Sequence, residues 1–212
     1  MLRVAVDAGH FSSHPGACAH GVREVDINKR VIEYLKTELA YQGISSVECV
    51  GTSSSVKESA KQKAAAANKA NADIYVSVHC NSYILASAHG CETYHYPSSS
   101  KGKILAGYIR DQVVNEFGLR DRGVKSAKFI VLQKTSMAAA LLEWAFLSNP
   151  QERALMVDPN NQKRCAKAIS YAVLRYFGKA PQTSDSTTTI ADLQAKVDQL
   201  QDKINRAKAI LN

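Results

Sequence analysis

The sequence lacks the marks of a disulfide-rich, membrane-spanning or exported protein. Its five cysteines form an odd, scattered set without a C-x-x-C pair, which argues against a disulfide framework and predicts free thiols. No stretch approaches the roughly 18 apolar residues that a membrane helix needs. Met1 leads directly into an apolar strand pattern rather than a signal-peptide pattern. We therefore expect synthesis in the cytoplasm, without a signal peptide or transmembrane segment.

The composition is that of an ordinary globular protein with an excess of positive charge. The 212 residues are 45% hydrophobic and 22% charged, and they suffice for one domain with a substantial core and a short appendage. The formal net charge of +8 predicts attraction to polyanions. Nucleic acids, anionic membranes and anionic cell-wall polymers all satisfy that condition, so charge alone does not choose among them.

Hydrophobic periodicity and turn residues predict an alternation of strands and helices up to about residue 178. Apolar residues at helical spacing recur in four segments, and short apolar or β-branched runs lie between them. We predict helices over residues 27–39, 56–70, 103–117 and 163–177, and strands over 2–10, 44–50, 74–79, 91–96, 129–132 and 138–143. This order predicts an α/β fold with a mostly parallel, mixed sheet and helices on both faces.

Three of the apolar runs deliver a metal-ligating or acidic side chain where the strand should end. His10 and His79 close two of the runs, Glu143 closes a third, and Glu24 stands at the head of a helix. In open α/β sheets the ligand crevice lies outside the carboxyl ends of the strands, so these side chains should share one crevice. Two histidines and one glutamate suffice to hold a catalytic zinc with an open position for water, while a second glutamate handles protons.

Each of these residues also has an ordinary structural explanation. A histidine at a strand end is more often a structural residue than a ligand, and Glu24 would be favoured in a first helical turn by the helix dipole. Glu143 is more informative because it lies between Leu142 and Trp144. A carboxylate inside an apolar run costs free energy unless a charged or hydrogen-bonding partner receives it. The convergence of all four in one crevice is what favours the functional interpretation.

A second group of metal-binding residue types lies in the loop after the first strand. It consists of His14, Cys18 and His20, which out of context suggest a structural zinc. Their spacing matches none of the familiar Cys/His patterns, so we do not predict a site there.

Residues around the strand over 91–96 are weaker candidates. His89 and His95 could line a groove, but His95 alternates in phase with other residues of the strand, so packing on the sheet fits it at least as well. Glu92 is interpreted as a strand-face residue and not as a catalyst.

The C-terminal part differs sharply in composition from the rest. Residues 179–189 form a polar linker, and residues 190–212 show an apolar heptad pattern typical of an amphipathic helix. An isolated helix of this length is marginal in water, so it should pack on its own domain or pair with a second copy as a homodimer. The apolar positions are Ile190, Leu193, Val197, Leu200, Ile204, Ala207 and Leu211. We therefore predict a domain over 1–178, the linker, and a C-terminal helix.

Several sequence blocks resemble those of a known enzyme family. Over residues 2–178 their order and spacing are similar to the zinc-dependent N-acetylmuramoyl-L-alanine amidases of the amidase_3 type. The blocks are Val6–His10, Glu24, Asn71–Asn81, Gly90–Tyr94, Arg120–Lys125 and Leu141–Glu152.

The resemblance implies an activity and a role for each of the four residues. His10, Glu24 and His79 match the family's zinc ligands, and Glu143 matches its catalytic glutamate. The family hydrolyses the amide between N-acetylmuramic acid and L-alanine in bacterial peptidoglycan. Zn²⁺ would polarise the carbonyl, while the glutamate would move a proton from water to the leaving amine. Two features depart from the family pattern: Cys80 replaces a small residue, and the segment after Val50 lacks an arginine and aspartate pattern.

A basic domain without a signal peptide, followed by a linker and a small module, is similar to phage or prophage endolysins. The resemblance thus implies action on the bacterial cell wall, with peptidoglycan and anionic wall polymers as partners rather than nucleic acid. Two alternatives remain open at this point. One is a non-catalytic wall-binding module on the same fold, and the other is a zinc peptidase that cuts within the stem peptide.

Overall fold

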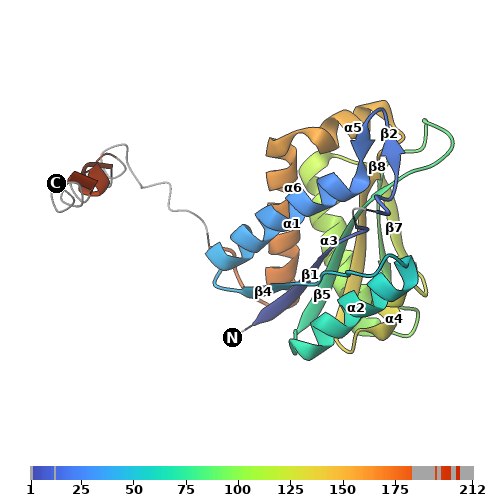
Figure 1. The fold of residues 1–212 in the computed structure, drawn as a ribbon, viewed down its shortest axis with the longest axis horizontal. Coiled ribbons are helices and arrows are strands. Elements are labelled where there is room, and N and C mark those ends of the chain that lie inside the picture. The colour runs from blue at the N-terminus through green and yellow to red at the C-terminus, as the bar shows by residue number, and fades with distance from the viewer. Residues whose placement is uncertain (1, 12, 183–193, 195–196, 202–203, 206–212) are drawn as a thin grey trace. The chain divides into compact units, whose positions relative to one another are not determined.

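The computed structural model describes residues 2–11, 13–182, 194, 197–201 and 204–205 (Figure 1). The chain divides into two units, Met1–Pro181 and Gln182–Asn212. The first unit contains the sheet and all of the helices that pack against it. This boundary falls within residues 179–189, for which the sequence predicts a linker.

A six-stranded sheet with the order β4-β1-β5-β8-β6-β7 forms the centre of the first unit. Its strands are β1 (Arg3–Ala8), β4 (Ser45–Glu48), β5 (Ile74–Asn81), β6 (Cys91–His95), β7 (Asp121–Ser126) and β8 (Ala138–Phe146). Strands β4, β1, β5 and β8 are parallel, whereas β6 runs antiparallel to β8 and parallel to β7. The mostly parallel, mixed sheet is confirmed. A small antiparallel pair, β2 (Cys18–Ala19) and β3 (Val22–Arg23), lies outside it.

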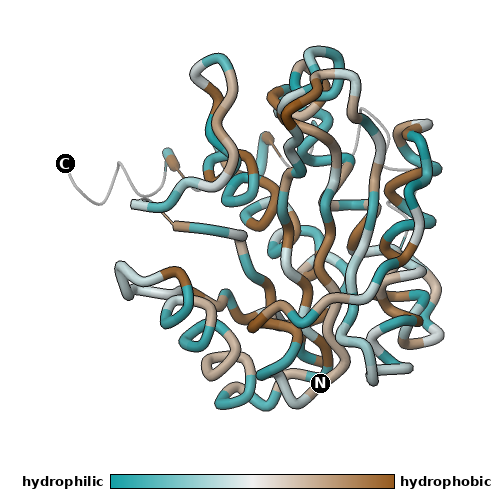
Figure 2. The backbone as a smooth tube through the Cα atoms, turned by 90° about the vertical axis from the view of Figure 1, so that its right-hand side faces the viewer, coloured by the Kyte–Doolittle hydropathy of each residue, from teal (hydrophilic) through white to brown (hydrophobic). Residues whose placement is uncertain are grey.

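Helices cover both faces of this sheet, as the sequence predicts. The elements are α1 (Glu24–Tyr41), α2 (Val56–Lys69), α3 (Ser100–Phe117), α4 (Ile130–Lys134), α5 (Pro150–Val157) and α6 (Pro159–Tyr176). Because successive side chains of a strand point to opposite faces, Val4 and Val6 pack with α1, α3 and α6, while Ala5 packs with α2 and α4. In Figure 2 the apolar segments follow the central strands and the helix sides that face them.

The prediction of a strand over 129–132 is wrong, because this segment enters the helix α4. Periodicity cannot separate a strand from a helix in so short an apolar run. Val131 and Leu132 are buried in the core cluster that includes residues of α2, whereas Phe129 is exposed. The strand β7 was not predicted from sequence, because its residues alternate poorly and are only partly buried.

The remaining predicted helices and strands of the first unit are confirmed, with ends that shift by a few residues. All five cysteines are free, as expected, and only Cys18 is exposed. No helix among the described residues is long and apolar enough to cross a membrane.

The heptad prediction is only partly covered by the described residues. Val197, Leu200 and Ile204 are helical and exposed, by 56%, 59% and 47%. The other four heptad positions, Ile190, Leu193, Ala207 and Leu211, lie outside the described residues. A continuous amphipathic helix therefore stays a prediction.

Candidate active site

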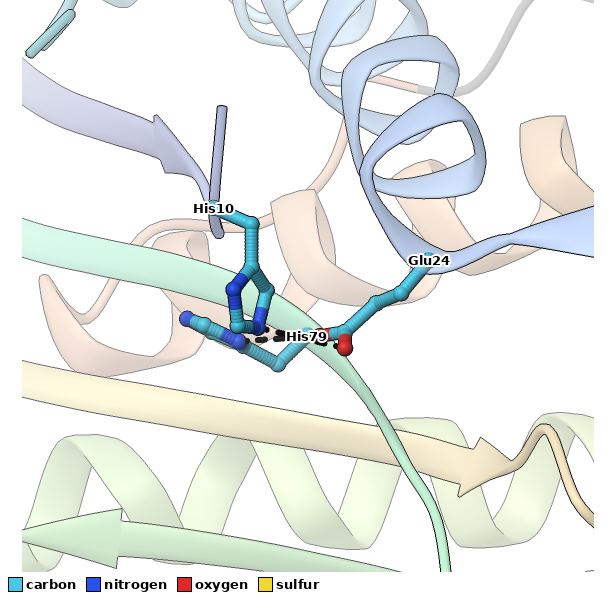
Figure 3. A group of neighbouring side chains, drawn as sticks. All are labelled: His10, Glu24 and His79. Atoms are coloured by element: carbon cyan, nitrogen blue, oxygen red, sulfur yellow. Dashed lines mark hydrogen bonds and ion pairs between the residues drawn. The ribbon is translucent and has the colours of Figure 1, made fainter. Parts of the chain in front are cut away.

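Three of the residues singled out by sequence meet at one edge of the sheet. His10 follows β1, Glu24 is the first residue of α1, and His79 belongs to β5 (Figure 3). His10 Nε2 lies 3.1 Å from Glu24 Oε2, and His79 Nδ1 lies 3.0 Å from Glu24 Oε1. The three ligand atoms all lie within 4.8 Å of one another. In the part of the chain that the structure describes, no other group of three histidines, cysteines or carboxylates is placed to hold a metal.

The Glu24 carboxylate at the centre of this group is buried and fully engaged. Besides the two imidazoles, it accepts hydrogen bonds from the backbone N–H of Ala17 (2.8 Å) and of Cys80 (3.0 Å). Burial acts to raise the pKa of Glu24, but the hydrogen bonds with His10 and His79 outweigh it and hold that pKa well below its usual range. The carboxylate therefore stays ionised, which is the form that binds a metal ion.

Two glycines leave the space that these side chains occupy. A Cβ atom on Gly9 would lie 2.3 Å from Cε1 of His79, and one on Gly16 would lie 2.3 Å from Oε2 of Glu24. Gly16 also has a φ of +75°, which favours glycine. Sequence analysis did not assign these glycines a role at the site. Gly9 directly precedes His10, and that position is the signal that could have found it, whereas Gly16 adjoins no ligand in the sequence.

Glu143 lies beside this group on the central strand β8. It pairs in register with His79 of β5, and it lines a cavity of about 440 Å³ together with His10 and His79. Its Oε2 atom is buried and has no hydrogen-bond partner among the described residues. Burial raises the pKa of Glu143 well above its usual range, and the nearby charges of Glu24 and Glu92 add to this effect. Because Glu143 lines this cavity, its carboxyl group can exchange protons with a polar molecule bound there.

Glu92 has a more specific environment than the sequence suggested. Because β6 is antiparallel to β8, its first residues lie at the same edge, and Glu92 pairs in register with Glu143. Its buried carboxylate accepts hydrogen bonds from Arg122 (2.6 Å), Tyr94 (2.6 Å) and Lys125 (2.5 Å). Burial acts to raise the pKa of Glu92, but these bonds lower it to about 2. Glu92 is thus a fixed anion that anchors two cations near Glu143.

A second cavity, of about 470 Å³, lies at the same edge of the sheet. Its lining includes Asn81, two residues after His79 in β5, and Glu92, the register partner of Glu143. Arg120 and Arg122 line it as well, and the Arg122 guanidinium lies 4.7 Å from the centre of the Phe146 ring. The lining of the cavity at Glu143 includes the apolar Phe11, Phe129 and Leu141, whereas charged side chains line the cavity at Glu92.

The weaker candidates from sequence do not join the site. His14, Cys18 and His20 are exposed, and they belong to no metal-binding group among the described residues. The ring of His89 is exposed and contacts the carbonyl of Ser87. His95 is buried in β6, which agrees with a packing role.

The central group has the chemistry of a zinc site. Two imidazole nitrogens and one carboxylate oxygen are a common ligand set for catalytic Zn²⁺, which keeps its fourth position open. The buried, ionised Glu24 supplies negative charge, and the cavity beside His10 and His79 gives access. The residues present therefore fit a zinc ion.

Comparison with known proteins agrees with this geometry. The family model of N-acetylmuramoyl-L-alanine amidase, Amidase_3, matches residues 4–175. The YqiI protein of Bacillus subtilis (strain 168) is 33% identical over 177 residues, covering 82% of this chain and 84% of its own length. The endolysin of Bacillus phage SPP1 is 37% identical over 160 residues, covering 72% of this chain and 58% of its own length.

A solved structure shares the fold. The N-acetylmuramoyl-L-alanine amidase from Clostridium difficile 630 superposes with a TM-score of 0.76 at 29% identity, over 84% of this chain and 97% of that one. The family match includes every residue of the candidate site and all of the sheet except Arg3. This chain is therefore a member of the N-acetylmuramoyl-L-alanine amidase family of the Amidase_3 type.

Proposed function

We propose that this protein is a zinc-dependent N-acetylmuramoyl-L-alanine amidase of bacterial peptidoglycan. It hydrolyses the amide that joins N-acetylmuramic acid to the L-alanine of the stem peptide. The observation that carries the proposal is the convergence of His10, Glu24 and His79 beside Glu143, at one cavity, in a chain of this family. His10, Glu24 and His79 hold the zinc ion, and Glu143 is the catalytic residue.

The proposed mechanism divides the work between the metal and Glu143. When bound, zinc supplies Lewis-acid chemistry, which polarises the scissile carbonyl and makes water acidic. Glu143, which lines the cavity with His10 and His79, accepts the proton of the attacking water and delivers it to the nitrogen of the leaving L-alanine. A carboxyl group with a raised pKa holds that proton long enough to act as the acid in the second step.

The protein acts on the cell wall, and the relative from Bacillus phage SPP1 favours an endolysin role. The net charge of +8 suits an anionic wall and its polymers. A non-catalytic wall-binding module would not need an orphaned buried glutamate beside a metal-binding group. A zinc peptidase that cuts within the stem uses the same metal chemistry, so the position of the cut separates it from the amidase.

Digestion of purified peptidoglycan tests the proposed bond directly. We expect new free amino groups on L-alanine and no new reducing sugar ends, because only the amide to the muramic acid lactyl group is cut. End-group analysis of the soluble fragments measures both. New amino termini on other residues of the stem would contradict the amidase and support the peptidase. Absence of any cleavage by the zinc-loaded protein would support the binding module.

Metal analysis tests the ligand set. We expect about one zinc per chain and loss of hydrolysis after chelation, since three protein ligands hold a catalytic zinc. His79→Ala should bind zinc much more weakly, and His20→Ala serves as the matched control because His20 is exposed and outside the site. Zinc-free preparations that still lyse walls would refute the metal centre, and the reverse ranking of the two variants would move it to the loop.

Replacement of Glu143 separates catalysis from metal binding. We expect Glu143→Ala to keep its zinc and its melting temperature but to lose activity by roughly 10²- to 10⁴-fold, the usual contribution of a general acid–base group. Glu116→Ala is a control, because Glu116 lies in an exposed ion pair with Arg164. Loss of zinc together with activity in Glu143→Ala would make this residue a ligand instead.

The C-terminal segment is proposed to pair two copies of the chain. Val197, Leu200 and Ile204 are each helical and exposed, and they lie at heptad spacing in the sequence. Light scattering should find that the full chain dimerises with increasing concentration, whereas residues 1–181 stay monomeric and still cleave peptidoglycan. Leu200→Asp should weaken the dimer, because it places a charge among the apolar heptad residues that pair the two helices. A full chain that is monomeric at high concentration would contradict the pairing.

A further inference from the structure

A buried lysine, Lys63 of α2, contacts the loop that carries His10. Its side chain is only 7% exposed, and its Nζ atom lies 2.6 Å from Oδ1 of Asp7. Nζ also donates hydrogen bonds to the carbonyl oxygens of Ala8 (2.8 Å) and His10 (3.1 Å). Two of the three N–H donors of the ammonium thus have carbonyl acceptors, and the charge is paired with that of Asp7. The ammonium is thus held in one place and connects α2 with the end of β1.

The partner carboxylate is held just as firmly. The side chain of Asp7 is 2% exposed, and its Oδ2 accepts hydrogen bonds from the hydroxyls of Tyr75 (2.7 Å) and Ser77 (2.8 Å). Both hydroxyls belong to β5, the strand that carries His79. Lys63 and Asp7 therefore tie together the three elements α2, β1 and β5 just before the metal-binding residues.

The backbone at His10 needs such support. Its φ is 68°, in the left-handed region that residues other than glycine rarely adopt. Conformations of this kind persist only when the surrounding structure fixes them. Lys63 binds the carbonyls of Ala8 and His10, and Asn28 binds the carbonyl of Gly9 between them at 3.2 Å. Three consecutive carbonyls of the turn are thus held by buried side chains.

We propose that Lys63 is a positioning residue for the metal centre. Its ammonium fixes the left-handed turn that directs the His10 imidazole toward Glu24 and His79. This role rests on the proposed function, because it takes His10 as a metal ligand. It adds Lys63 to the residues on which the metal site depends. Lys63 also lines the same cavity as Glu143.

Removal of Lys63 alone would leave the Asp7 carboxylate buried without its cation and could unfold the protein. The test therefore uses the double variant Asp7→Asn/Lys63→Met, which removes both charges and keeps an oxygen for the hydroxyls of Tyr75 and Ser77. Asp7→Asn alone keeps the ammonium and its two carbonyl bonds. Lys61→Met is the matched control, because Lys61 lies two residues away on α2 in an exposed pair with Glu58.

The readouts are zinc affinity, by competition with a chromophoric chelator, and amide hydrogen exchange of residues 9–16 in the metal-free protein. We expect the double variant to bind zinc roughly 10- to 100-fold more weakly than wild type, as found when groups behind metal ligands are removed. Its loop should also exchange faster. Lys61→Met should match wild type in both measurements. Asp7→Asn should melt earlier, because it leaves the ammonium buried without its anion, but it should bind zinc more tightly and exchange more slowly in this loop than the double variant.

Two outcomes decide against the positioning role. A double variant that melts earlier but matches Asp7→Asn in zinc affinity and in exchange would show that the pair only stabilises the fold. Equal loss of zinc affinity in Asp7→Asn would assign the effect to the carboxylate. A wild-type protein that binds no zinc would refute the proposed metal centre, and the exchange measurement would still decide whether Lys63 holds the turn.

Discussion

Burial of the ionised Glu24 carboxylate is the constraint on which the rest of the site depends. An ionised group in the protein interior costs several kcal/mol unless its oxygens are fully satisfied. Here two imidazoles and the backbone N–H groups of Ala17 and Cys80 surround the carboxylate. These partners come from the loop after β1 and from β5, so the burial of the Glu24 carboxylate at the start of α1 depends on both segments. Gly16 makes that convergence sterically feasible.

Three carboxylates at the same edge of the sheet are kept in different states by their surroundings. Glu24 is ionised through its imidazoles and backbone donors, and Glu92 through its hydrogen bonds with Lys125, Tyr94 and Arg122. Glu143 has no such partner for Oε2, and burial raises its pKa, which makes its carboxylate a stronger proton acceptor. Environments that separate the pKa values of neighbouring carboxylates also separate their roles. One glutamate can therefore bind a metal, another can hold cations, and the third can carry a proton.

Much of this arrangement could be predicted from the sequence, because parallel strands bring their carboxyl ends to one edge. That rule placed His10, His79 and Glu143 together, and the helix start placed Glu24. The rule could not predict the place of Glu92 beside Glu143, because the sequence does not reveal that β6 runs antiparallel to β8 and begins at this edge. Nor could it reveal Lys63, whose position on a helix rich in alanine and lysine gives no sign of a buried ammonium. The run over 129–132 was misassigned because tertiary packing decided between strand and helix.

X-ray absorption at the zinc K-edge of the metal-loaded protein tests the central claim most directly, since it measures which atoms bind the metal. The account predicts nitrogen and oxygen ligands at roughly 2.0–2.2 Å, with the multiple-scattering signature of two imidazoles. It also predicts that His79→Ala lowers the imidazole number, whereas His14→Ala leaves it unchanged. A sulfur ligand at about 2.3 Å would contradict the account, because it would place the metal at a cysteine such as the exposed Cys18.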